Sequence, residues 1–213
     1  MLQSDQSIFY FMRLRLLFCS ALLSLLYGCS SLPDGPERRV DLPEQLQALQ
    51  QVNKWKIQGK MALRANEQAI SATLVWRNSP EAFHFRLTNL LGITLINMRY
   101  ADDVASLEAD GETYTHADPQ ALIKQTTGWD LPVNQLLNWV KGLPGATDNY
   151  TLNNKDLLAT LVPGDCTGCG NWEVSYANYG LVGETWLPHS LLLTDIKQPN
   201  TFIKFRIDRW TLL

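Results

Sequence analysis

The chain has 213 residues, with 18 lysines and arginines against 21 aspartates and glutamates, and a formal net charge of −3. Residues 1–28, which have the features of a removable leader, hold two of the arginines and one aspartate, so the rest carries 16 basic and 20 acidic residues, a net charge near −4. With no basic cluster, this composition argues against nucleic-acid binding. The remaining 185 residues suffice for one domain with a sizeable core and are too few for two.

The leader is a short apolar run behind positive charges. Arg13 and Arg15 precede residues 16–26, which are nearly all apolar and too few to span a bilayer comfortably as a permanent helix. This pattern predicts a secretory signal peptide over residues 1–28. Met12 begins a more typical signal than Met1, which leaves both as candidate start sites.

The signal ends in Leu26-Tyr27-Gly28-Cys29, which resembles a bacterial lipobox. In that resemblance Cys29 is the lipidated first residue of the mature protein, and two or three acyl chains together anchor a protein firmly. Ser30 stands where lipoproteins of the inner membrane usually have aspartate, which favours the periplasmic face of the outer membrane. Tyr27 is bulkier than is usual there, and the alternative is a plain signal peptide followed by an ordinary Cys29.

The mature chain is predicted to begin with a tether. Residues 29–40 are rich in proline, glycine and charge, which favours a lipidated linker rather than packed structure. The folded domain is then expected to cover residues 41–213. It starts with a short amphipathic helix over residues 43–53, in which two leucines and a valine recur at helical spacing.

Most of the domain is predicted to form β-strands in hairpin order. The clearest signal runs from Lys54 to Arg64, where polar and apolar residues alternate with a period of two. Further strands are predicted over residues 71–77, 83–88, 93–100, 104–108, 113–116, 156–162, 172–177, 190–196 and 201–210, several of them separated by polar turns.

One connection between these strands has unusual chemistry. Asn89 and Gly92 are turn residues, yet Leu90 and Leu91 lie between them and Ile93 follows. Hairpin tips are normally polar because they lie in water, so an exposed apolar tip indicates a surface that binds a membrane or a partner's apolar groove. The alternative is that Gly92 marks a bulge in one long buried strand, with both leucines in the core.

Two short helices are predicted to interrupt the sheet. Asp118 and Pro119 have the features of an N-cap and a first helical residue, and Gly128 is a plausible stop. A second helix is predicted from Pro132, with apolar residues at helical spacing, and Gly142 ends it. About ten strands in meander order are too many for a flat sheet of this length, so we expect an antiparallel, incompletely closed β-barrel, a half-barrel. The helices then form a lid over an apolar cavity.

The sequence offers little catalytic chemistry. His84, His116 and His189 have no metal-ligand spacing and no neighbouring nucleophile, and we interpret them as strand-face or turn residues. Phosphate-binding glycine loops and paired catalytic carboxylates are also missing from the sequence. We therefore expect no metal, no cofactor and no enzymatic activity. The seven tryptophans are interpreted mainly as core or rim residues, and some of them could line the cavity.

Cys166 and Cys169 form a C-x-x-C pair between glycines in a predicted hairpin loop. An oxidising envelope compartment favours a disulfide between them that closes the loop. A redox motif would be expected at the start of a helix in a βαβ unit, and a zinc site would need two further ligands. Free thiols, a redox role and a metal role remain as alternatives.

These features together resemble the LolB family of outer-membrane lipoprotein receptors. The resemblance rests on the lipobox ending at Cys29, the strand start Trp-Lys-Ile-Gln-Gly-Lys-Met at 55–61, and Leu90-Leu91-Gly92. It continues through Thr127-Gly128 and 132–136, and its most specific part is Asn-Trp-Val-Lys-Gly-Leu-Pro-Gly at 138–145. Tyr27 and the Cys166–Cys169 loop depart from the family pattern.

The resemblance implies a receptor that takes lipoproteins from a soluble periplasmic carrier of the LolA type and releases them into the outer membrane. Acyl chains would occupy the cavity, and the family's exposed loop leucine, which acts in membrane insertion, corresponds to Leu91, with Leu90 as a second contact. The expected partners are the carrier, lipoprotein acyl chains and outer-membrane lipid, and the expected state is a monomer. The main alternative is a structural or assembly lipoprotein that holds a protein partner on the same apolar surface, and a third is a periplasmic enzyme with an unrecognised site.

Overall fold

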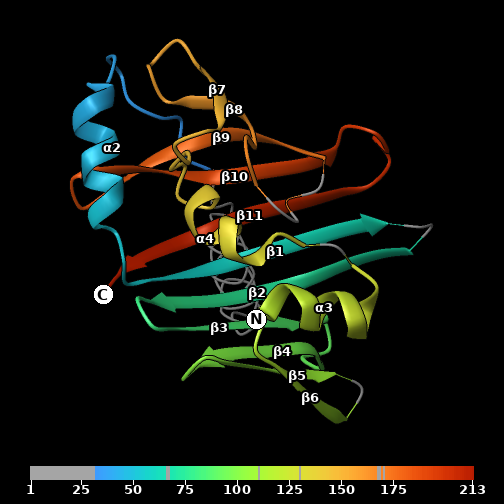
Figure 1. Cartoon of the computed structure of the whole chain (residues 1–213). Coiled ribbons are helices and arrows are strands. Elements are labelled where there is room, and N and C mark those ends of the chain that lie inside the picture. Colours follow the sequence, from blue (N-terminus) through green and yellow to red (C-terminus); the bar gives the residue numbers. More distant parts are fainter. Residues whose placement is uncertain (1–31, 66–67, 110, 130, 167–168, 170) are drawn as a thin grey trace, which may run out of the picture. The chain divides into compact units, whose positions relative to one another are not determined.

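The computed structural model describes residues 32–65, 68–109, 111–129, 131–166, 169 and 171–213 (Figure 1). The predicted signal peptide and Cys29 lie outside the described residues, so their assignments stay predictions. Residues 32–213 form one compact unit. Among its described helices, none combines the length and apolarity that crossing a membrane would require.

The unit is built on one antiparallel sheet of eleven strands in the order β6-β5-β4-β3-β2-β1-β11-β10-β9-β8-β7. The first and last strands of this order, β6 and β7, are edges, so the sheet stays open and the predicted half-barrel is confirmed. The strands are β1 Trp55–Ala65, β2 Gln68–Ser79, β3 Ala82–Thr88, β4 Thr94–Ala101, β5 Val104–Ala109, β6 Glu112–His116, β7 Asn149–Leu152, β8 Leu158–Val162, β9 Trp172–Val182, β10 Thr185–Asp195 and β11 Phe202–Leu212.

Two helices, α3 Pro119–Thr127 and α4 Val133–Trp139, lie on the chain between the edge strands β6 and β7 and cross one face of the sheet (Figure 1). Asp118 caps α3 as predicted, because its carboxylate accepts a hydrogen bond from the Gln120 amide at 2.9 Å. Gly128 ends α3 in the left-handed conformation at φ 75°, where glycine carries no steric penalty.

The remaining helix, α2 Leu42–Gln51, is held against β10 by a side chain that imitates strand pairing. The Gln45 amide donates to the Trp186 carbonyl at 2.7 Å and accepts from the Trp186 N–H at 3.1 Å. Both backbone groups of Trp186 are thereby satisfied by one side chain from the helix.

The face of the sheet beneath α3 and α4 is the hydrophobic core. In β1 the residues Trp55, Ile57, Met61 and Leu63 are buried, as the alternation predicted. Gly59 takes the remaining inward position, and a Cβ atom there would lie 2.0 Å from the Arg206 carbonyl oxygen. The strands β1 and β11 therefore approach too closely at this irregularity for any other residue.

The structure differs from the sequence-based strands at several boundaries. β9 continues to Val182 and β10 begins at Thr185, five residues beyond the predicted ranges 172–177 and 190–196. β7 was not predicted, because all four of its residues are exposed and no buried alternation marks it. Ile93 was assigned to a strand, but β4 begins at Thr94 and Ile93 belongs to the preceding loop, where it is exposed.

Candidate functional site

An entirely apolar cavity lies between the sheet and the two helices. Its volume is about 30 Å³, and none of its lining surface is polar. The sheet provides Met61, Trp76, Phe83, Phe85, Met98, Ile203 and Phe205, and the helical segment provides Ile123, Leu131, Val133 and Leu136. Aromatic rings form part of the wall, where Trp76 meets Phe85 edge to face with ring centroids 5.5 Å apart.

The cavity is small in this structure. A single water needs about 10–15 Å³, so a volume of 30 Å³ has room for about two waters. An acyl chain with more than a dozen carbons needs far more space. To bind such a ligand in this cavity, α3 and α4 would have to move away from the sheet. We therefore call the helical segment the lid.

A second space of about 170 Å³ adjoins the cavity at one end of the sheet. Leu131 and Ile203 line both spaces, so the two lie next to each other. Its remaining wall includes Trp129 and Trp172 together with polar residues of the turn that joins β10 to β11. We refer to this space as the mouth. Its walls are both apolar and polar, whereas the cavity is wholly apolar.

The loop between β3 and β4 presents an apolar tip to solvent. The exposed fractions are 94% for Leu90, 85% for Leu91 and 58% for Ile93. The loop is held in shape by Asn89, whose side-chain oxygen accepts from the amides of Leu91 at 2.9 Å and Ile93 at 3.0 Å. Gly92 permits the turn with φ 82°.

The loop and the mouth lie at the same end of the sheet. β3 ends at Thr88, which pairs with Thr73 on β2, towards the end where β1 leads into β2. The β10–β11 turn, which lines the mouth, lies at this end as well, since Phe202 pairs with Arg64 near the end of β1. The exposed leucines and the mouth therefore share one end of the sheet.

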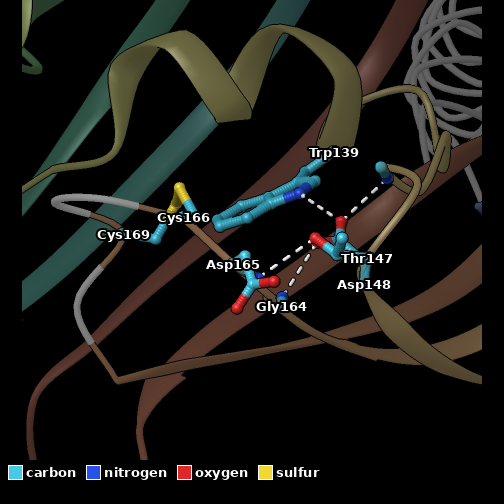
Figure 2. Close-up of a disulfide and its surroundings, with 8 residues drawn as sticks. Trp139, Thr147, Asp148, Gly164, Asp165, Cys166 and Cys169 are labelled. Atoms are coloured by element: carbon cyan, nitrogen blue, oxygen red, sulfur yellow. Dashed lines mark hydrogen bonds between the residues drawn. A yellow bond between two sulfur atoms is a disulfide. The ribbon is translucent and has the colours of Figure 1, made fainter.

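Cys166 and Cys169 are joined in a disulfide in the loop that connects β8 to β9 (Figure 2). Cys169 is 1% exposed and belongs to the hydrophobic core, and Cys166 packs against it. Figure 2 also shows the segment that follows α4 reaching this loop. The disulfide therefore lies in the core, in the loop that the segment after α4 reaches, and is not an isolated feature of the surface.

Asp148 links the segment after α4 to the β8–β9 loop, and the sequence analysis did not identify it. Its carboxylate accepts hydrogen bonds from the Trp139 indole at 3.2 Å, the Gly145 amide at 2.9 Å and the Gly164 amide at 3.1 Å. A Cβ atom on Gly164 would lie 1.9 Å from the Thr147 carbonyl oxygen. Trp139 and Gly145 are part of the segment at 138–145, so its most characteristic residues fasten the end of α4 to the β8–β9 loop.

Lys141 fastens the same segment to α2. It is only 5% exposed, and its ammonium group donates to the carbonyls of Leu49 at 3.2 Å and Val52 at 2.9 Å. Burial lowers the pKa of Lys141. The two carbonyls belong to the last turn and C-cap of α2, where a cation also interacts favourably with the helix dipole.

The histidines lie apart from the cavity and have local partners. His84 contacts the Asn97 side chain at 2.7 Å, His116 accepts from the Asp118 amide at 2.8 Å, and His189 contacts the Ile207 carbonyl at 2.7 Å. Within the described part of the chain, no group of three or more potential metal-binding side chains occurs.

Comparison with known proteins places this arrangement in a family. The family described as "Outer membrane lipoprotein LolB" matches residues 53–210. This chain belongs to the LolB family. A LolB-named outer-membrane lipoprotein of Vibrio cholerae is 35% identical over 93% of this chain and 97% of its own length. Its counterpart in Psychromonas ingrahamii is 33% identical over 91% of this chain and 94% of its own length.

Solved structures with very different sequences share the fold. A LolA-superfamily protein from Nitrosomonas europaea matches with a TM-score of 0.53 at 6% identity, over 82% of this chain and 94% of its own. A putative outer-membrane lipoprotein-sorting protein domain from Vibrio parahaemolyticus matches with a TM-score of 0.52 at 9% identity, over 80% of this chain and 90% of its own. These two matches show that the fold of this chain also occurs in proteins of very different sequence.

Proposed function

We propose that this LolB-family chain is an outer-membrane lipoprotein receptor. It accepts lipoproteins from a soluble periplasmic carrier of the LolA type, holds their acyl chains between the sheet and α3 and α4, and inserts them into the outer membrane. The observation that carries the proposal is a wholly apolar cavity under a two-helix lid, next to a mouth at the same end as an exposed leucine loop.

The proposed chemistry is transfer without a covalent step. Acyl chains leave one apolar site for another, and the direction follows from the difference in binding free energy between the two. Each buried CH₂ group contributes about 0.8 kcal/mol, so a small difference in buried length or in the work of opening the lid biases the transfer. No nucleotide is required.

The lid is fastened at the end that follows α4. Asp148 and Lys141 hold the segment after α4 to the β8–β9 loop and to α2. Between the two helices, Gly128 separates α3 from the segment leading to α4, and a Cβ atom on it would meet nothing within 4 Å. We infer that opening displaces α3 and the start of α4, while the end of α4 stays attached.

The exposed loop and the anchor complete the proposed role. Leu90 and Leu91 contact the membrane when the cargo is delivered, and Gly92 allows the turn that presents them. Cys29 carries the lipid anchor, residues 29–40 serve as the tether, and the domain at 41–213 works as a monomer on the periplasmic face of the outer membrane. Loop, anchor and tether are assigned here from their chemistry and from the family.

The alternative is a structural or assembly lipoprotein that binds a protein partner through the same apolar surface. The family names and the shared fold favour the receptor. The two functions also differ in what the cavity must do, because a structural lipoprotein needs no lid that opens and no affinity for acyl chains.

A transfer experiment tests the proposal directly. The chain from residue 29 with Cys29→Ala is mixed with a LolA-type carrier that holds a tagged lipoprotein, in the absence of nucleotide, and is then recovered through its own affinity tag. We expect the lipoprotein to be recovered with the receptor. An unlipidated form of the same lipoprotein serves as the control and should stay behind. Failure of transfer from an active carrier to a folded receptor would overturn the proposal in favour of the structural alternative.

A further inference from the structure

The face of the sheet that points away from the helices collects positive charge. Nine lysines and arginines occupy outward positions on the five adjacent strands β4, β3, β2, β1 and β11. Seven of them are exposed and two are half-buried. These residues, which we call the basic face, are Lys56, Lys60, Arg64, Arg77, Arg86, Arg99, Lys204, Arg206 and Arg209.

Strand pairing places these cations beside one another. Lys56 lies opposite Arg77, and Lys60 lies opposite Arg206. No basic cluster is visible along the sequence, because the cations are spread over more than 150 positions and alternate with buried residues. The sheet brings them together, so the sequence-based conclusion that the chain has no basic cluster is wrong for the folded molecule.

Little negative charge offsets the basic face. Asp208 is the one acidic residue pointing outward on the five strands, and it pairs with Arg206 at 2.9 Å. The remaining eight cations form no ion pair within the described ranges. The face holds nine cations and one carboxylate, a net +8, which leaves nine basic and twenty acidic residues for the rest of the sequence. A chain that is acidic overall is therefore strongly polarised.

We propose that the basic face docks on a bilayer surface that contains anionic phospholipid. Long, mobile side chains dispersed over an open sheet suit a fluid layer of phosphate groups, and none of the nine residues lines the apolar cavity. The face is also continuous with an apolar element, since β3 and β4 carry both Arg86 and Arg99 and the loop with Leu90 and Leu91. Apolar insertion combined with basic attraction is the general basis of peripheral membrane binding.

The docking has a consequence for delivery. Cations near a surface of anionic lipid each contribute about 1 kcal/mol, a factor of about five in affinity. Arg64 belongs to the basic face and also lines the mouth, at the end where the leucine loop projects. Docking therefore brings the mouth near the lipid into which cargo would pass. The inference extends the proposed receptor function, but vesicle binding can be measured without carrier or cargo, so the two can fail separately.

The test is flotation of the Cys29→Ala chain with vesicles of phosphatidylcholine, with and without added phosphatidylglycerol. We expect the anionic vesicles to be bound more tightly, and the difference to disappear in high salt because exposed charges are screened. The triple variant K60E, R86E and K204E should lose binding to anionic vesicles by about a hundredfold or more. A K60Q, R86Q and K204Q variant, which removes charge without reversing it, should be intermediate.

The matched control reverses three exposed cations outside the basic face and away from the mouth, R38E, R39E and K124E, and so changes the net charge equally. This control should retain most of the binding to anionic vesicles. Equal losses in the two charge-reversal triples would show that only net charge matters and would overturn the proposal. Wild-type binding that does not respond to phosphatidylglycerol would overturn it as well, as would capture of an acidic protein by the basic face without affinity for the vesicles.

Discussion

At the scale of single residues, Leu91 makes the clearest prediction. Its side chain is 85% exposed, so Leu91→Glu removes apolar surface from the loop without opening the core. We expect folding and acceptance of lipoprotein from the carrier to persist, while insertion into vesicles falls by about tenfold or more, because a carboxylate resists entry into hydrocarbon. Insertion is measured by separating vesicle-bound from receptor-bound lipoprotein.

Val104→Glu provides the control for this prediction. Val104 is 50% exposed at the opposite end of the sheet, where it begins β5 directly after the turn from β4. This substitution introduces the same charge away from the mouth and should insert cargo as the wild type does. Normal insertion by Leu91→Glu would remove Leu91 from the mechanism.

Asp148 supports a second prediction at this scale. Asp148→Ala leaves the Trp139 indole and the Gly145 and Gly164 amides without their acceptor. We expect the free energy of unfolding to fall by about 2–3 kcal/mol, measured by urea denaturation, because partly buried donors lose hydrogen bonds to a charged group. Asp165→Ala is the control, since Asp165 is exposed and contributes its backbone amide to Thr147. Equal stability of the two variants would contradict the role given to Asp148.

At the scale of elements, the sequence predicted what depends on local pattern. The ends of α3 were predicted at Asp118 and Gly128, because an N-cap needs a side chain that accepts a hydrogen bond and a left-handed C-cap favours glycine. The strand at Trp55 follows directly from alternation over a half-buried sheet. β7 was missed because an exposed edge strand needs no such alternation. Asp148 was missed because its donors come from residues up to 16 positions away, and only the folded chain brings them together.

The lid gives the prediction that belongs to elements. The strands β1 and β11 are paired on both sides in the middle of the sheet, whereas the backbone hydrogen bonds of α3 and α4 are local to the helices and their ends. Local opening should therefore be easier in the helices, and their amide hydrogens should exchange faster than those of β1. Hydrogen exchange should slow in α3 when a triacylated lipopeptide is bound. Exchange in α3 that is as slow as in β1, and unchanged by the lipopeptide, would contradict a moving lid.

At the scale of the whole molecule, two opposite faces of one sheet have different tasks. Alternation places apolar side chains under the helices and cations on the other face, so each strand contributes to both. The open edges allow the lid to cross the apolar face without closing the barrel. The proposed cargo site and the proposed membrane-docking face thus arise from a single pattern of period two.

The stability of the whole molecule should depend on pH through His189. The ring is buried and its Nδ1 lies 2.7 Å from the Ile207 carbonyl oxygen, which can only accept, so Nδ1 carries the proton. Burial lowers the pKa of His189, despite opposing contributions from the Ile207 hydrogen bond and from Asp208. In the unfolded chain the imidazole titrates near its ordinary value of about 6.5. Below that pH the unfolded state binds the proton first.

The free energy of unfolding should therefore decrease as the pH falls from about 6.5 towards the lowered pKa of the folded state, by at most about 1.4 kcal/mol per pH unit. His189→Asn keeps an N–H donor near the Ile207 carbonyl but cannot titrate, so its stability should change less over the same range. Lys141, whose pKa is lowered by burial, is present in both proteins, so its contribution to the pH dependence cancels in the comparison. Urea denaturation of both proteins between pH 5 and 7 measures the difference, and parallel pH profiles would show that His189 is not the group that couples folding to protonation.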